Sequence, residues 1–154
     1  MIKYLSIILT LLIPAATVAQ VNYDSLKLAF IIADSDSAKC MIGFQIARNY
    51  IEENRDSALL YCNKTLKLAE KNNQFLVHAG TLDIKGYLLM WLGKYGESLR
   101  CFQDALIIIE DAKKQSKSWL ADSLDPYEEQ RLARLASIHH DLGHLMRSTG
   151  KTDQ

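Results

Sequence analysis

The stretch HHDLGH, residues 139–144, contains the side chains of this sequence that are best suited to chemistry. His140 and His144 are four residues apart, so a helix would place both imidazoles on one face, as in the two-histidine zinc motif. Asp141 stands where that motif has its catalytic glutamate. Because Asp is shorter than Glu and no third ligand is evident, a metal-dependent hydrolase that uses these three residues is the alternative hypothesis, not the main one.

Nucleophilic catalysis has even less support, since no Ser or Cys is paired in sequence with a histidine and an orienting third group. The three cysteines, Cys40, Cys62 and Cys101, each lie inside a segment with helical spacing. We interpret them as small buried apolar residues, with one disulfide as the alternative. The sequence therefore predicts no catalytic residue, no metal ligand and no cofactor.

The N-terminus has the features of a secretory signal peptide. Lys3 precedes a short apolar run, and the small residues Thr17 and Ala19 follow it. We predict cleavage after Ala19, hence a signal peptide over 1–19 and an exported domain over 20–154, periplasmic or extracellular. An uncleaved anchor is the alternative. No later segment is apolar enough to contact a membrane, and 18 basic against 18 acidic residues give no field that would attract nucleic acid.

The rest of the chain predicts helices only, because apolar residues recur every three or four positions and no stretch alternates as a strand does. Two segments repeat, DSALLYCNKTLKLAE at 56–70 and GESLRCFQDALIIIE at 96–110. Their apolar and small positions correspond at an offset of 40 residues: Ala58, Leu59, Cys62, Leu66 and Ala69 match Ser98, Leu99, Phe102, Leu106 and Ile109. A repeated unit with one apolar face predicts stacking of successive units.

The helices upstream repeat as well. Ala47, Tyr50 and Asn54 match Gly86, Leu89 and Gly93, and a third copy follows at Gly143, Met146 and Gly150. Gly86 and Gly143 are predicted to allow close helix crossings, and Gly93 to adopt positive φ at a helix end, with Tyr95 packing back into that turn. The third unit stops near STGKTDQ, residues 148–154, before a second helix. We therefore expect a domain truncated within its third repeat, whose open last helix self-associates or meets a partner.

The second unit resembles the tetratricopeptide repeat family. The residues that match the family's pattern, in the same order, are Leu82, Gly86, Leu89, Gly93, Tyr95, Ser98, Phe102 and Ala105. The first unit departs from that pattern, with Ala47 at the crossing position. The resemblance implies an all-α fold, an α-solenoid of stacked antiparallel helix hairpins with about two and a half repeats. The layout is also similar to the exported N-terminal repeat region of Bacteroidetes-type sensor proteins, which implies a part in signal transduction.

In that family, the face of each first helix that turns away from the packing contact lines a concave groove. The resemblance carries this role to nine positions: Phe44, Arg48, Ile51, Asp83, Tyr87, Met90, His140, His144 and Arg147. Mixed aromatic, charged and apolar side chains suit a peptide or protein segment. The alternative for Phe44, Ile51 and Met90 is that they belong to the core. We expect a non-catalytic protein-binding module, with a purely structural, self-associating segment as a further alternative.

Overall fold

A computed structural model describes residues 23–111 and 127–150 of the chain, and within these ranges all regular structure is helical. The described helices are α1 (Tyr23–Ile32), α2 (Asp36–Asn49), α3 (Arg55–Lys71), α4 (Phe75–Trp91), α5 (Tyr95–Glu110) and α6 (Tyr127–Ser148). The predicted all-α class is therefore confirmed. The predicted signal peptide at 1–19 and the last residues, 151–154, lie outside the described residues.

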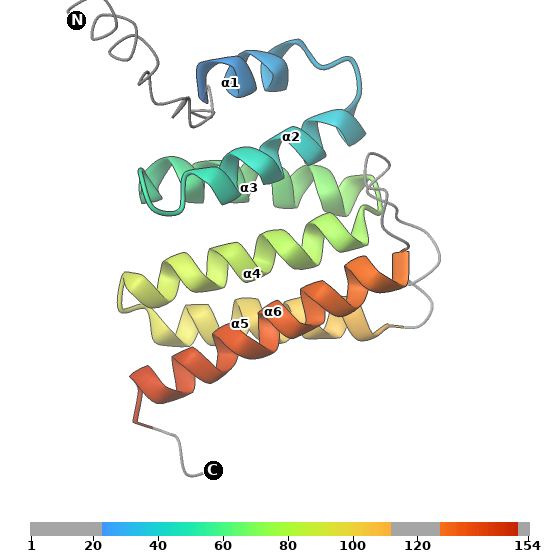
Figure 1. Ribbon diagram of the computed structural model, residues 1–154. Helices are drawn as coiled ribbons and strands as arrows, with labels where there is room; N and C mark the ends of the chain where they lie inside the picture. The colour runs from blue at the N-terminus through green and yellow to red at the C-terminus, as the bar shows by residue number, and fades with distance from the viewer. Residues whose placement is uncertain (1–22, 112–126, 151–154) are drawn as a thin grey trace, which may run out of the picture.

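The helices lie in a stack, with α1 at one end and α6 at the other (Figure 1). Helices α2 and α3 form one antiparallel hairpin, and α4 and α5 form the next. Helix α4 is central, because it packs against α2, α3, α5 and α6. Helix α1 packs on α2 and also contacts α3, since the rings of Phe30 and Tyr61 meet edge to face with centroids 5.4 Å apart. Helix α6 lies obliquely across α4 and α5. Together, α2, α4 and α6 form one face of the molecule.

The predicted sequence repeat is matched by a repeat in burial. Residues 58–70 of α3 and 98–110 of α5 have the same sequence of buried, half-buried and exposed positions, and only Leu59 and Leu99 differ. Cys62 and Phe102 occupy equivalent positions and are both fully buried. Each helix thus turns the same face to its neighbours, as helical apolar spacing requires.

The turns before α4 and α5 are built in the same way. Asn73 and Gly93 both adopt left-handed φ, 54° and 71°. In each turn the following N–H reaches back to a carbonyl five residues earlier: Gln74 to Ala69 and Lys94 to Leu89, both at 2.9 Å. This pattern satisfies carbonyls that the helix end leaves open. The prediction for Gly93 is confirmed, whereas Tyr95 is 42% exposed and fills the turn less than expected.

Gly86 allows the closest crossing within the second hairpin. A Cβ at this position would lie 2.7 Å from Phe102 Cε1, and the Gly86 carbonyl accepts a 2.7 Å hydrogen bond from Ser98 Oγ. The prediction of a close crossing at Gly86 is confirmed. The same prediction for Gly143 is wrong in the described structure, because a Cβ there would meet only Arg147 Nη1, at 3.9 Å. No described helix packs on α6 at that position.

Candidate functional site

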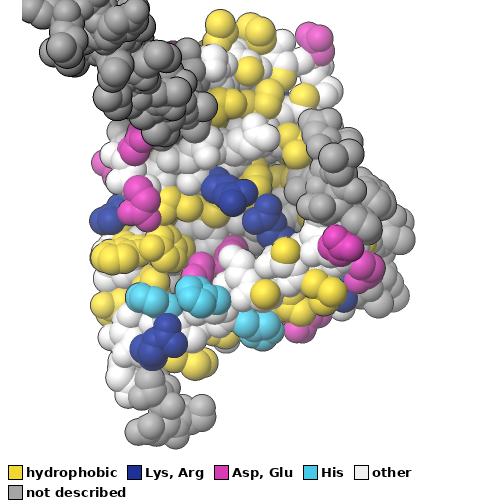
Figure 2. All heavy atoms as spheres, viewed as in Figure 1, with side chains coloured by type: hydrophobic (Ala, Val, Ile, Leu, Met, Phe, Trp, Pro, Cys, Tyr) yellow, Lys and Arg dark blue, Asp and Glu magenta, His cyan; other side chains and the backbone are white. Residues whose placement is uncertain are grey.

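A groove of about 260 Å³ lies between the end of α2, the middle of α4 and the middle of α6. Figure 2 shows basic side chains gathered over the centre of this face, with histidines along α6. The groove is lined by Arg48, Ile51, Glu52, Asp83, Ile84, Tyr87, Arg134, Ser137 and Asp141. Three helices that are distant in sequence therefore supply one polar surface.

Four of the nine residues predicted for a concave face meet in this groove: Arg48, Ile51, Asp83 and Tyr87. Arg48 is exposed, while Ile51 and Tyr87 are half-buried. They come together because α2 and α4 lie side by side in the same orientation, so that equivalent positions of the two helices face the same side (Figure 1).

The other predicted positions lie elsewhere. Phe44 and Met90 are 4% and 5% exposed and belong to the core, which was the alternative for both. His140 and Arg147 are exposed and His144 is half-buried, and none of the three lines the groove.

Helix α6 contributes a different set of side chains, Arg134, Ser137 and Asp141. Sequence reasoning missed the first two and considered Asp141 only for metal chemistry. Their spacing of three and four residues places them on one helical face, and this was the available signal. Matching the residues of α6 to those of α4 predicts His140, His144 and Arg147 for the groove instead. The prediction fails because α6 crosses its neighbours obliquely (Figure 1).

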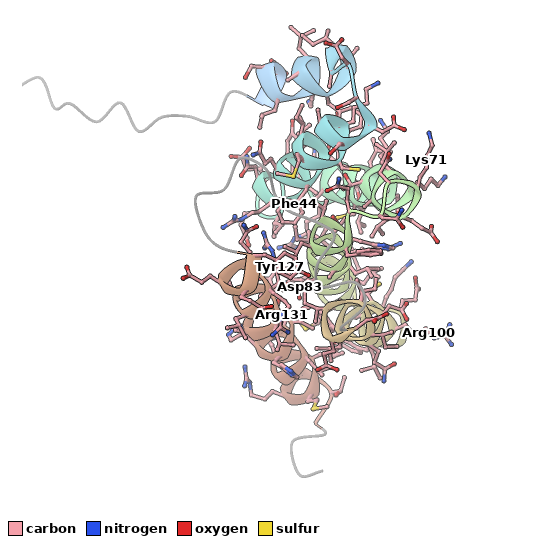
Figure 3. The ribbon with its side chains drawn as sticks, turned by 90° about the vertical axis from the view of Figure 1, so that its right-hand side faces the viewer. Phe44, Lys71, Asp83, Arg100, Tyr127 and Arg131 are labelled. Atoms are coloured by element: carbon pink, nitrogen blue, oxygen red, sulfur yellow. The ribbon has the colours of Figure 1, made fainter. Side chains whose placement is uncertain are left out.

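Asp83 is the most unusual residue of the groove. Figure 3 shows Asp83 and Phe44 on the side of the stack toward α6, while Lys71 and Arg100 point to the opposite side. Asp83 is only 4% exposed. Its Oδ2 accepts a 2.7 Å hydrogen bond from Ser137 Oγ on α6, but its buried Oδ1 has no hydrogen-bond partner within the described structure. Buried carboxylate oxygens rarely lack one.

Burial also raises the pKa of Asp83 to about 6. The negative charge of Asp141 raises it further, whereas the hydrogen bond from Ser137 and the charges of Arg134 and His140 oppose the shift. Loss of hydration is the largest of these effects, as expected for a carboxyl group that is buried away from water. Asp83 thus remains mostly ionised at neutral pH while one of its oxygens is unpaired.

Arg134 extends from α6 across the surface of α4. Its guanidinium lies 4.6 Å from the centroid of the Phe44 ring, a cation–π contact. Gly80 leaves the room for this side chain, because a Cβ there would be 3.2 Å from Arg134 Nε and 3.1 Å from Phe44 Cε2. Burial lowers the pKa of Arg134, and the like charge of Arg48 lowers it further, against the attraction of Asp83. Two guanidinium groups therefore repel each other at the groove.

The groove continues into aromatic side chains along α4. Tyr87 and Trp91 contact each other edge to face, with ring centroids 6.1 Å apart. The guanidinium of Arg55 lies 5.0 Å from the centroid of Trp91, whose side chain is 52% exposed. Asp83, Tyr87 and Trp91 are each four residues apart and so follow one face of the helix. This face of α4 thus has a buried carboxylate at one end and exposed aromatic surface at the other.

The histidine-rich stretch has a simpler arrangement. His140 Nδ1 lies 3.0 Å from Asp141 Oδ1, with 73% of the His140 side chain exposed. Among residues 23–111 and 127–150, no group of three His, Cys, Asp or Glu side chains is placed to hold a metal ion. The third ligand that a zinc hydrolase needs is thus not found there, so the geometry gives this alternative no support.

The site and fold together define an all-helical protein with a polar, partly aromatic groove across three helices. The chain matches no family model, and neither a curated protein nor a solved structure is significantly similar to it. None of the described helices has both the length and the apolar character needed to cross a bilayer.

Proposed function

We propose that this chain is a non-catalytic interaction module of the tetratricopeptide-repeat type, in which stacked helix hairpins offer the groove between α2, α4 and α6 to a protein or peptide segment. The observation that carries the proposal is the composition of the groove: two guanidinium groups, three carboxyl groups and the ring of Tyr87, which contacts the neighbouring ring of Trp91 outside the groove. Such mixtures of charged and aromatic groups are typical of protein-binding surfaces.

The solenoid part of the proposal is supported by the order of contacts. Each hairpin packs internally, α3 packs on α4, and the first helices α2, α4 and α6 contact one another in sequence. The equal burial patterns of α3 and α5 agree with this arrangement. In repeat proteins, successive units bury a shared core in this way and leave one extended surface for binding.

The cellular setting is part of the same proposal. The signal-peptide pattern at 1–19 supports export to the periplasm or the cell exterior, and the resemblance to sensor-type repeat regions supports a role in detecting a partner for a signalling protein.

The proposal is tested by photo-crosslinking from inside and outside the groove. A benzophenone amino acid replaces Tyr87 in one variant and the exposed Tyr95, which does not line the groove, in a control. We expect a defined partner to be linked from position 87 and not from 95, and the yield to fall when Arg48→Ala is added. The same partners linked equally from both positions would contradict the groove assignment.

Self-association is the second candidate, because apolar side chains remain exposed on the outer helices. On α6, Leu132 and Met146 are 53% and 41% exposed, and on α5 Ile107 is 65% exposed. Light scattering coupled to size exclusion decides this candidate. A monomer at all concentrations would exclude it, whereas a dimer that Leu132→Glu dissociates would support it.

A further inference from the structure

Helix α6 is attached to the stack by few buried side chains. Only three of its 22 residues are buried, whereas 12 of the 17 residues of α4 are buried. The apolar part of the contact is made by Ile138 and Leu145, which belong to one core cluster with side chains of α4 and α5. A helix that buries so little can separate from its neighbours at a smaller cost than unfolding of the whole stack.

The polar part of the contact includes Asp83. Ser137 Oγ donates a 2.7 Å hydrogen bond to Asp83 Oδ2, which joins α6 directly to α4. The other oxygen, Oδ1, is buried and has no hydrogen-bond partner within the described structure. Because water solvates a negative charge poorly at a buried oxygen, the ionised carboxyl group is unfavourable while α6 is in place.

Charged groups face Asp83 from the two helices that share the groove with α4. They are Arg48 and Glu52 on α2, and Arg134, His140 and Asp141 on α6. On α3 and α5, Lys71 and Arg100 point to the opposite side of the stack (Figure 3). Three of the five groups around Asp83 therefore move away with α6 when that helix separates.

The groups on α6 act on Asp83 in opposite directions. The charges of Arg134 and His140 favour its ionised form, whereas the charge of Asp141 disfavours it. The attraction does not offset the loss of hydration, since the pKa of Asp83 is still raised from 3.8 to about 6. Protonation of Asp83 removes both the poorly solvated charge and the repulsion from Asp141.

We propose that the contact between Asp83 and α6 is a pH-sensitive switch, in which α6 packs firmly on α4 while the carboxyl group is protonated and separates more often once the group is ionised. Because the carboxyl group holds its proton more tightly with α6 in place, the packing of α6 is most stable near pH 4 and loses this stabilisation as the pH rises through about 6. The inference rests on the proposed function for its consequence, since α6 forms one side of the groove. That side is complete in mildly acidic surroundings and opens more often at neutral pH.

Hydrogen exchange of the full ¹⁵N-labelled chain measures how often α6 separates. NMR gives a protection factor for each amide at several pH values, relative to the intrinsic exchange rate at the same pH. No partner is added, so the result does not depend on whether the groove binds one. We expect α6 amides to be less protected than α4 amides at every pH. Their protection should fall about tenfold from pH 5 to pH 7.5, given a pKa of about 6 with α6 in place and 3.8 when α6 is separated.

Two variants and two controls show which group acts. Asp83→Asn can still accept from Ser137 but cannot ionise, so the protection of α6 should be the same at pH 5 and pH 7.5. Ser137→Ala removes the hydrogen bond that favours the ionised form, so the fall in protection should move to a higher pH. Asp104→Asn removes an exposed carboxyl group of α5, and His140→Gln removes the exposed imidazole of α6. Both controls should keep the fall in protection.

Several results would overturn the inference. The same fall in protection in Asp83→Asn would assign the pH response to another group. Equal protection of α6 and α4 amides would show that α6 opens only when the whole stack unfolds. Protection of α6 that is constant or rises between pH 5 and pH 7.5 would also refute the switch. None of these results bears on partner binding, which crosslinking from position 87 tests separately, and failure of that crosslink would leave the pH response of α6 standing.

Discussion

The ring of Phe102 occupies the space that a side chain at Gly86 would need, since a Cβ there would lie 2.7–3.0 Å from three ring atoms. The ring itself is fully buried and cannot withdraw easily. We predict that Gly86→Ala lowers the free energy of unfolding by about 2 kcal/mol, because overpacking outweighs the gain in helix propensity. Urea denaturation followed by circular dichroism measures this change.

Gly143→Ala is the matched control, at the position that the sequence repeat equates with Gly86. A Cβ at Gly143 meets nothing closer than 3.9 Å, so the variant should gain about 1 kcal/mol from helix propensity alone. Destabilisation of similar size in both variants would refute this difference and would indicate that another segment packs on α6 as α5 packs on α4.

Asp83 should make stability depend on pH. Its pKa is raised from 3.8 to about 6 in the folded state, so between these values the folded chain binds more protons than the unfolded chain. Stability contributed by this residue is therefore greatest near pH 4 and falls by about 2–3 kcal/mol as the pH rises through 6. Asp83→Asn should remove this loss.

The comparison is made by urea denaturation of both proteins at pH 4 and pH 7. The free energy of unfolding of Asp83→Asn, relative to the unmodified chain, should be higher at pH 7 than at pH 4. Asn can keep the contact with Ser137, so packing is little changed. A relative stability that is the same at both pH values would show that Asp83 has no raised pKa.

The cysteines should be inert in the folded protein. Burial raises the pKa of Cys62 to about 12 and that of Cys40 to about 11, and it also raises the pKa of Cys101. The reactive thiolate is therefore scarce, and the sulfur atoms are also shielded. Iodoacetamide at pH 8 should modify none of the three during a period in which all three react in denaturant, as mass spectrometry can record. Rapid modification of any one in the native protein would contradict this arrangement.

The two left-handed turns should respond in opposite directions to substitution. Asn73→Gly should stabilise the protein by about 0.5 kcal/mol, because glycine adopts a φ of 54° without strain. Gly93→Ala should destabilise it by about 1 kcal/mol, since alanine is strained at a φ of 71°. Thermal unfolding of both variants checks the pair, and a stabilising Gly93→Ala would refute the assigned backbone.

Much of the fold could be predicted because the same apolar spacing and the same turn positions recur in successive helices. The spacing of the apolar residues around Cys62 and Phe102 predicted which faces of α3 and α5 are buried. Gly86 predicted a close helix crossing, and Gly93 predicted a left-handed turn. Asn73 was missed because asparagine adopts left-handed φ less regularly than glycine. These features depend on contacts between consecutive helices, which sequence spacing describes well.

The groove was predicted only in part, because its third side depends on how α6 is oriented. The residues Arg48, Asp83 and Tyr87 follow from the register of α2 and α4. By contrast, Arg134 reaches the groove through the gap that Gly80 leaves beside Phe44, a relationship between three different helices. The spacing of Arg134, Ser137 and Asp141 places them on one face of α6, but it does not indicate that this face meets Gly80 and Phe44. The same contact explains why Phe44 is covered and does not line the groove.

The central position of α4 has a consequence for motion. Because it touches α2, α3, α5 and α6, this helix cannot open without disrupting most of the stack, whereas α1 lies at the end of the stack and packs on α2 and, through Phe30, on α3. Local opening should therefore begin at α1, and backbone amides of α4 should exchange with deuterium only through global unfolding. A partner bound in the groove would contact the slowest-exchanging part of the molecule, so its binding would stabilise the entire folded state against unfolding.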